Sequence, residues 1–263
     1  LSMLLNSPRA KDFSCNHTVE LMTAGAPPPA SVLQGIEKLG FNVTQVYGLT
    51  ETYGHTVMST WNTDWDDADA EHRAKLKARQ GAAMVMTGGM RIVDLESRDD
   101  VPADGESIGE ILIRGNTVMK GYLKDNENTI ESLKDGWFHT GDLAVMHPQG
   151  YAEIKDRLKD IIISGGENIS SVEIEGVLHK HEAVSLAAVV ALPDEKWGEV
   201  PCAFLELIDG MTVSESEIET FCRAHLAGFK RPKKVVFGEL PKTATGKIQK
   251  YELRTLARSG KLN

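Results

Sequence analysis

The sequence has few cysteines and no long apolar run, and these absences limit what the protein can be. Cys15, Cys202 and Cys222 are scattered and odd in number, which excludes a disulfide framework and a CxxC-type metal site and suits a reducing compartment. No stretch of about 18 apolar residues is present, so we expect no membrane span. The start lacks the basic region of a signal peptide, and the ending Lys261-Leu262-Asn263 is not a peroxisomal Ser-Lys-Leu. We therefore expect a cytoplasmic protein.

The charge is negative overall but uneven along the chain. The net charge is −9 over 263 residues, which argues against general binding to nucleic acid. Residues 1–157 carry 15 basic and 23 acidic residues, whereas residues 158–263 carry 14 and 15. Between residues 230 and 250 seven cations accompany a single acid, Glu239. Such a cluster is either a solvated face or a site for a small polyanion such as a nucleotide.

The first part of the chain has the pattern of an open α/β sheet followed by a small β unit. A strand at 19–24, a helix from Ser31 to about Lys38 and a strand at 41–48 favour a parallel sheet. Short strands separated by turns from residue 90 to about 151 predict an antiparallel, barrel-like unit.

The rest of the chain predicts a separate small domain. The charged run at 154–160 is interpreted as a linker. After it, helices and strands alternate over about 100 residues. Ser170 or Ser171 is the expected N-cap of one helix, and Ser214 with Glu217 has the spacing of a capping box for another.

Two motifs carry groups suited to binding a nucleotide. Tyr47-Gly48-Leu49-Thr50-Glu51 ends a strand, where ligands of open sheets bind. Its ring can stack on a purine, its hydroxyl can bond phosphate and its carboxylate can hold Mg²⁺. His139-Thr140-Gly141-Asp142 offers a carboxylate after a glycine turn, suited to ribose hydroxyls. Each motif alone has an ordinary interpretation as core packing, surface charge or an Asx-turn.

Two further motifs lie in the C-terminal part. Ser164-Gly165-Gly166-Glu167-Asn168 follows a strand, and its glycines permit close approach of a ligand to the backbone, although a simple turn explains them equally well. Pro241-Lys242-Thr243-Ala244-Thr245-Gly246-Lys247 is superficially similar to a P-loop. It fails that pattern because Ile248 follows the lysine and Pro241 stands where glycine is needed.

In this order, the four motifs and the run Lys155-Asp156-Arg157-Leu158-Lys159-Asp160 strongly resemble the adenylate-forming superfamily of acyl-CoA synthetases, luciferases and peptide-synthetase adenylation domains. The resemblance implies an α/β protein: a remnant of an α/β sheet lobe and a small β-barrel-like unit, then a separate small mobile α+β C-terminal domain. The expected parts are residues 1–157 of the large lobe (1–90 parallel α/β, 91–157 barrel-like), a hinge at 158–160 and a mobile domain at 161–263. The family's phosphate loop is not in this sequence, so the chain looks like a C-terminal half whose independent activity is in doubt.

The resemblance implies ATP-dependent acyl-CoA ligation, with ATP, Mg²⁺ and CoA as cofactors. A carboxylate attacks the α-phosphate of ATP to give an acyl-adenylate, and a thiol then displaces AMP. By resemblance the nucleotide is bound by Gly25, Ala26, Pro27, Tyr47, Gly48, Thr50, Asp142 and Arg157. Glu51 would bind Mg²⁺, and Thr50 the α-phosphate. Lys247 would stabilise the charge that develops as two anions approach.

The thiol step would require the small domain to rotate about Lys159, because Lys247 would otherwise be in the way. The resemblance then places CoA against Gly165, Gly166, Glu167, Trp197, Phe229, Lys230, Arg231 and Lys233. Trp197 has ordinary domain packing as its alternative role.

His55 and Met58 are candidates for the acyl pocket, and the region 43–80 looks most like synthetases for short- and medium-chain acids. The acid itself stays open, as does the oligomeric state. Two alternatives remain: an enzyme that loads a carrier protein, and a nucleotide- or CoA-binding fragment without catalysis. An unpaired apolar face on residues 1–90 predicts self-association.

Overall fold

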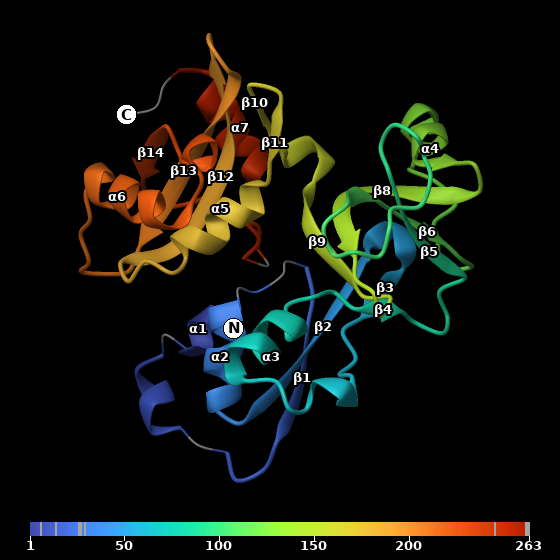
Figure 1. The fold of residues 1–263 in the computed structure, drawn as a ribbon, viewed down its shortest axis with the longest axis horizontal. Helices are drawn as coiled ribbons and strands as arrows, with labels where there is room; N and C mark the ends of the chain where they lie inside the picture. The colour runs from blue at the N-terminus through green and yellow to red at the C-terminus, as the bar shows by residue number, and fades with distance from the viewer. Residues whose placement is uncertain (6, 14, 26–27, 29, 245, 261–263) are drawn as a thin grey trace. The chain divides into compact units, whose positions relative to one another are not determined.

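The computed structural model describes residues 1–5, 7–13, 15–25, 28, 30–244 and 246–260 (Figure 1). The chain divides into two compact units, Leu1–Ile154 and Lys155–Asn263. Both combine helices with sheets, which confirms the mixed α/β class. The domain limits drawn from the sequence differ from this division by a few residues, and the hinge at 158–160 stays a prediction. Among the described residues, no helix is long and apolar enough to cross a membrane.

The first unit opens with a four-stranded sheet in the order β1-β2-β3-β4. β1 and β2 are parallel, as predicted, with helix α2 between them in the chain, and the other pairs are antiparallel. The helices and strands of this part are α1 (Ser2–Leu5), β1 (Val19–Thr23), α2 (Ala30–Lys38), β2 (Phe41–Leu49), β3 (Gly54–Met58), α3 (Ala70–Lys77) and β4 (Ala82–Ala83).

Helix α2 packs through one apolar face against β2. Leu33 and Ile36, three positions apart on this face, are fully buried and meet Val43 of β2. The helix ends where Gly40 takes a positive φ of 92°, a conformation that glycine adopts without steric cost. This packing fixes the direction in which β2 runs toward the Tyr47 motif.

An antiparallel half-barrel follows the first sheet, in agreement with the barrel-like unit expected from the sequence, and its last strand, β9, crosses the division between the two units. Its order is β5-β6-β8-β7, and β9 pairs with β8. The predicted glycine turn at 139–142 is wrong, because this segment lies inside the long strand β8, with Gly141 at φ 68° and a register irregularity in the pairing with β6. The elements are β5 (Gly89–Val93), β6 (Ile108–Arg114), α4 (Asn126–Ser132), β7 (Leu133–Lys134), β8 (Trp137–Met146) and β9 (Ala152–Arg157).

The charged run after β8 is not a solvated linker throughout, which corrects the sequence interpretation. Its first half belongs to β9, and only Leu158–Asp160 forms a short 3-10 turn. Asp156 is 2% exposed and accepts the backbone N–H of Ser171. The run of charges conceals this, because a buried carboxylate needs a tertiary partner that the local sequence does not reveal.

The second unit is a five-stranded sheet in the order β11-β10-β13-β12, with β14 parallel to β13. Ser170 is the N-cap of α5, and Ser214 with Glu217 forms the predicted capping box of α6. The last helix, α7, was not predicted. The elements are β10 (Ile162–Ser164), β11 (Glu167–Ile169), α5 (Ser171–Leu178), β12 (Val184–Asp194), β13 (Gly198–Leu207), α6 (Glu215–His225), β14 (Lys234–Phe237) and α7 (Lys250–Arg258).

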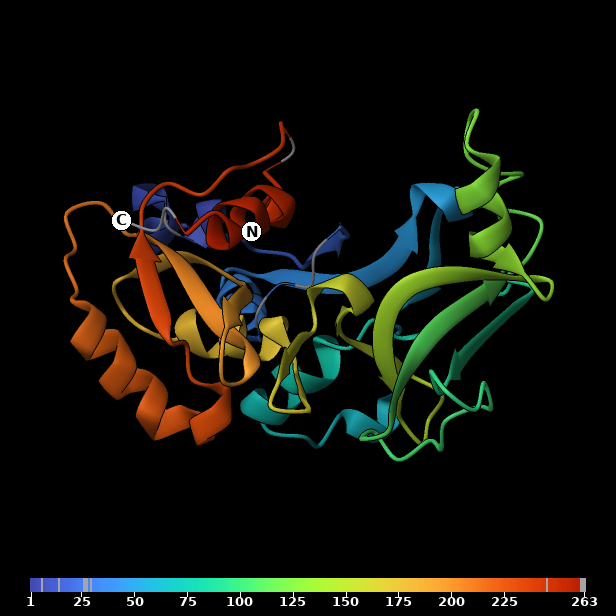
Figure 2. The same cartoon turned by 90° about the horizontal axis from the view of Figure 1, so that it is seen from above.

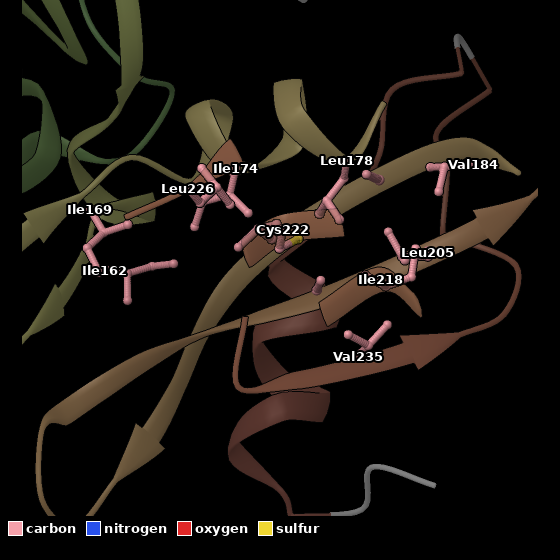
Figure 3. Packing of buried hydrophobic residues seen from close by; sticks show 13 residues of the cluster. Ile162, Ile169, Ile174, Leu178, Val184, Leu205, Ile218, Cys222, Leu226 and Val235 are labelled. Carbon is pink, nitrogen blue, oxygen red and sulfur yellow. The ribbon is translucent and has the colours of Figure 1, made fainter. Parts of the chain in front are cut away.

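Helices cover both faces of the β12–β13 pair (Figure 2). Val189 and Leu205 belong to the larger apolar cluster, on the face covered by α5 and α6. Figure 3 shows Leu205 of this cluster together with Ile174 and Leu178 of α5. The alternate positions point to α7, which buries Leu253 against them. The strands are therefore apolar on both faces, as expected for the middle layer of three.

Candidate active site

The end of β2 and the tight turn after it carry the first predicted motif. Thr52, 1% exposed, accepts the N–H of Leu49 at 2.9 Å and donates to the carbonyl of Gly54 at 2.8 Å. A Cβ on Gly48 would lie 1.9 Å from that same carbonyl oxygen, so only glycine fits there. The turn therefore presents Thr50 and Glu51 from a fixed backbone.

Tyr47 and Asp142 meet within the first unit. The Tyr47 hydroxyl donates to Asp142 Oδ2 at 2.8 Å, although the residues are 95 positions apart. Asp142 is 4% exposed and Tyr47 is half-buried. The side chains that the resemblance assigns to adenine and ribose are thus joined in one place, Tyr47 from β2 and Asp142 from β8.

A buried carboxylate that the sequence analysis missed holds the segment before Asp142. Glu110 of β6 is 5% exposed. It accepts the N–H of Gly141 at 3.1 Å, contacts Nδ1 of His139 at 3.0 Å and pairs with Arg98 at 3.2 Å. The available signal was a lone acid inside the apolar strand Ile108–Arg114, since a charge in such a position needs partners.

Tyr122, which the sequence analysis also missed, holds the Glu51 side chain. The Tyr122 hydroxyl donates to Glu51 Oε1 at 3.0 Å, and the Glu51 carbonyl accepts the N–H of Met119 at 2.7 Å. Burial, together with the hydrogen bond to Glu51, raises the pKa of Tyr122. Thr50 lies beside Glu51 with an exposed side chain.

The Glu51 turn is compatible with Mg²⁺. No cluster of three or more His, Cys, Asp or Glu side chains suited to a metal occurs among the described residues. Mg²⁺ commonly keeps several waters and binds through one or two carboxylates plus the phosphates of its nucleotide. A single glutamate fits that mode, and a bound Mg²⁺ would neutralise phosphate charge there.

The remaining predicted site residues of the first unit are Gly25, Ala26, Pro27, His55 and Met58. Gly25 has a φ of 91° at the end of the segment after β1, whereas Ala26 and Pro27 lie outside the described residues. On β3, His55 is exposed and Met58 is half-buried. The acyl pocket assigned to these two residues stays a prediction.

In the second unit the glycine motif packs against Trp197. Gly165 and Gly166, with φ of 60° and 89°, form the two-residue turn between β10 and β11. The Gly165 N–H donates to the Trp197 carbonyl at 2.8 Å, and a Cβ on Gly165 would lie 2.8 Å from the indole ring. Glu167 is exposed at the start of β11. Three of the residues assigned to CoA, Gly165, Gly166 and Trp197, are therefore neighbours.

The basic cluster at 230–250 is largely neutralised by glutamates from elsewhere in the second unit, which corrects the charge argument from the sequence. Four of its seven cations form ion pairs, because the fold brings acids from α5, α6 and β13 to them. The pairs are Lys230–Glu173 at 2.7 Å, Lys234–Glu215 at 3.0 Å, Lys242–Glu206 at 2.7 Å and Lys250–Glu175 at 2.7 Å.

The other residues assigned to CoA lie near the short turn at 228–230. Arg231 Nε donates to the Leu226 carbonyl at 3.1 Å, and Lys233 is exposed. Both are among the residues that line a cavity of about 260 Å³. Phe229 is 45% exposed, with Lys230 Nζ 5.7 Å from its ring centre. The positive charge left for a phosphate here comes from Arg231 and Lys233.

Three predicted residues of the second unit lie at its two ends in the chain. Arg157 is half-buried at the end of β9, and Lys159 is exposed in the 3-10 turn that follows. Lys247 lies in an exposed loop before α7, where its backbone N–H donates to Thr243 Oγ1 at 3.1 Å.

Comparison with known families identifies both units. Residues 1–123 match the family described as AMP-binding enzyme, and residues 173–247 match the AMP-binding enzyme C-terminal domain. The chain belongs to the AMP-binding enzyme family. The resemblance to adenylate-forming enzymes drawn from the motifs is confirmed.

Relatives in this family include two plant ligases and one bacterial synthetase of known structure. A 2-methylpropanoate–CoA ligase of Humulus lupulus is 53% identical over 262 residues, which cover 98% of this chain and 47% of the relative. A peroxisomal acetate/butyrate–CoA ligase of Arabidopsis thaliana is 50% identical over 263 residues, covering 98% and 46%. The o-succinylbenzoate CoA synthetase of Bacillus subtilis, in complex with its acyl-adenylate intermediate, has a TM-score of 0.80 and 31% identity, covering 96% and 49%. The chain spans about half the length of these relatives.

Proposed function

We propose that the protein is an ATP-dependent acyl-CoA ligase. In the first step a carboxylate oxygen attacks the α-phosphorus of ATP, and pyrophosphate leaves. In the second step the CoA sulfur, as the thiolate, attacks the acyl carbon and AMP leaves. The observation that carries this proposal is the hydrogen bond between Tyr47 and Asp142, which joins an aromatic ring and a carboxylate suited to adenine and ribose. The relatives named as CoA ligases support the reaction.

The roles we propose follow from the chemistry of each side chain. Asp142 accepts the ribose hydroxyls, with Arg157 assisting, and Thr50 donates to the α-phosphate. Glu51 holds Mg²⁺, and the Lys247 ammonium stabilises the charge that develops between carboxylate and phosphate. The Gly165 turn and Trp197 flank the pantetheine arm, while Arg231 and Lys233 pair with CoA phosphates.

We propose a short- or medium-chain acid as the substrate, in a pocket that includes His55 and Met58. The names of the relatives, which specify 2-methylpropanoate, acetate and butyrate, support this class. We also propose a cytoplasmic location, which the three free cysteines support. The test is to follow a fluorescent fusion of the protein that leaves its C-terminus free. Accumulation of this fusion in peroxisomes would contradict the cytoplasmic location.

Self-association through β1 is a further part of the proposal. β1 is the edge strand of the first sheet among the described residues, and Met22 on it is 64% exposed. Sedimentation velocity should show a species larger than the monomer, and Met22→Lys should shift it toward the monomer. A monomer at all concentrations would contradict this part alone.

The test of the proposal is direct detection of the thioester. The full-length protein, whatever its extent beyond these 263 residues, is incubated with ATP, Mg²⁺, CoA and each acid from acetate to octanoate, and with benzoate. Mass spectrometry should find acyl-CoA with one or more of the short or medium acids, and none without ATP. Transfer to a phosphopantetheinylated carrier protein but not to CoA would instead support the carrier-loading reaction. Nucleotide binding without any product would support a non-catalytic role.

A further inference from the structure

The loop that carries Lys247 is closed on itself. We define the Lys247 loop as residues 242–250, of which 245 lies outside the described residues. Lys242 and Ile248 pair as an isolated antiparallel bridge, and the Thr243 N–H donates to the Lys247 carbonyl at 2.8 Å. Gly246, at φ 83°, donates to the Thr243 carbonyl at 2.9 Å. The loop is thus a compact turn whose orientation depends on what holds its two ends.

The first end is anchored to β13. Lys242 Nζ contacts both carboxylate oxygens of Glu206, at 2.9 and 2.7 Å. Glu206 also accepts the N–H of Leu240 at 3.0 Å. One carboxylate therefore binds both the Lys242 side chain and the backbone of Leu240, two residues earlier in the segment that enters the loop. This fixes the position and the direction of that segment.

The second end is anchored to α5 and β12. Lys250 Nζ lies 2.7 Å from Glu175 Oε1 and donates to Ser171 Oγ at 2.8 Å. The same Glu175 oxygen accepts the N–H of Val189 at 2.7 Å. The Lys250 and Glu175 side chains are mostly buried, so the loss of either partner leaves a charge with little access to water.

We propose that Glu206 and Glu175 are positioning residues for Lys247, an inference that rests on the proposed function of that lysine. The two ion pairs bracket the loop from opposite ends and join it to the sheet and to α5. Stabilising charge in a transition state requires an ammonium held in advance, and a displacement of about 1 Å costs up to about a hundredfold in rate. The glutamates thus act through Lys247 without touching a substrate.

The test separates the two half-reactions in the full-length protein. Adenylation is followed as carboxylate-dependent ATP–pyrophosphate exchange, and thioester formation is followed from synthetic acyl-adenylate and CoA. Glu206→Gln and Glu175→Gln should each slow adenylation by about tenfold or more and leave thioester formation within about twofold. The exchanged-charge double variant Glu206→Lys with Lys242→Glu should recover part of the loss.

Glu215→Gln is the matched control, because it removes the Lys234–Glu215 pair of the same unit, which does not hold the loop. It should leave adenylation within about twofold. Equal losses in both half-reactions of Glu206→Gln would overturn the proposal and show general destabilisation. Unchanged adenylation in Glu206→Gln, with adenylation lost in Lys247→Ala, would also overturn it.

Amide hydrogen exchange keeps the proposal testable without activity. In this chain, peptides within 241–250 should exchange faster in Glu206→Gln than in wild type or Glu215→Gln. Unchanged exchange would overturn the proposal even if no adenylation is found. If Glu175→Gln fails to fold, Glu206→Gln provides the test, because the Glu206 side chain is less buried than that of Glu175. Lys247→Ala with wild-type adenylation would contradict the proposed function of Lys247, whatever the exchange result.

Discussion

Tyr47 donates a 2.8 Å hydrogen bond to Asp142, and this bond joins the end of β2 to the middle of β8. The two strands belong to different sheets of the first unit. Each side chain comes from a motif that alone has an ordinary structural interpretation. Their contact is what makes a shared role in binding one nucleotide physically reasonable.

The first prediction concerns the Tyr47 hydroxyl. Tyr47→Phe keeps the ring but removes the donor to a buried carboxylate, so we expect a loss of about 1–3 kcal/mol in unfolding free energy and weaker AMP binding. Urea unfolding and isothermal titration calorimetry measure the two effects. Tyr53→Phe is the control, because Tyr53 is 89% exposed. Equal effects of the two substitutions would contradict the prediction.

A second prediction concerns the close packing at Gly48. Gly48→Ala would place a Cβ 1.9 Å from the Gly54 carbonyl oxygen, so the turn must shift, at a cost of about 1–3 kcal/mol in unfolding free energy. Gly238→Ala should change stability by less than about 0.5 kcal/mol, because no atom lies within 4 Å of the added Cβ and φ is not positive there. Chemical denaturation of both variants decides the matter, and a neutral Gly48→Ala would show that the turn is not as rigid as described.

The third prediction concerns the pKa of Tyr122. Burial raises this pKa above its ordinary 10.0, and the hydrogen bond to Glu51 adds to the rise. In Glu51→Gln the negative neighbour is gone, so Tyr122 should ionise at lower pH than in wild type. Ultraviolet difference titration measures this against Tyr122→Phe, which assigns the signal. An unchanged pKa of Tyr122 in Glu51→Gln would show that the Glu51 carboxylate does not raise the pKa of the phenol.

Tyr122→Phe should also weaken the binding of Mg²⁺ together with nucleotide, because Glu51 loses the donor that orients its carboxylate. Calorimetric titration of ATP with and without Mg²⁺ measures this. The affinity for ATP without Mg²⁺ should be unaffected, and a loss of equal size in both conditions would point to a general defect.

The fourth prediction is a loss of stability in alkaline solution that arises from Cys202. Burial raises the pKa of this thiol from 9.0 to about 12. Because the folded pKa is the higher one, the stabilisation is fully present below pH 9 and is lost as the pH rises toward the folded value. The slope is about 1.4 kcal/mol for each pH unit.

Comparison with Cys202→Ala isolates this effect from other groups that titrate in the same range. The unfolding free energy of wild type should fall relative to that of Cys202→Ala between pH 9 and 11. A constant difference over that range would mean that the thiol ionises alike in both states.

Much of the fold follows from local pattern. The strand–helix–strand start, the α6 capping box and the mixed α/β class were all predictable, because each depends on residues close together in the chain. Successive side chains of β12 and β13 face the two helical layers alternately, which also depends only on neighbouring residues in the chain.

What could not be predicted depends on partners far apart in the sequence. The buried state of Asp156 requires Ser171 on α5. The neutralised lysines at 230–250 require glutamates from other elements, and the role of Glu110 becomes clear only when β6 and β8 are paired. Helix α7 was missed because its many charged residues obscure the apolar positions Leu253 and Ala257.

The central claim is that Lys247 stabilises formation of an acyl-adenylate, and carboxylate-dependent pyrophosphate release tests it most directly. The full-length protein, Lys247→Ala and the exposed control Lys180→Ala are compared with ATP, Mg²⁺ and a panel of acids. We predict release that requires a carboxylate, falls by about a hundredfold or more in Lys247→Ala and is unchanged in Lys180→Ala. Release that needs no carboxylate, or that proceeds equally fast in Lys247→Ala, would contradict the claim.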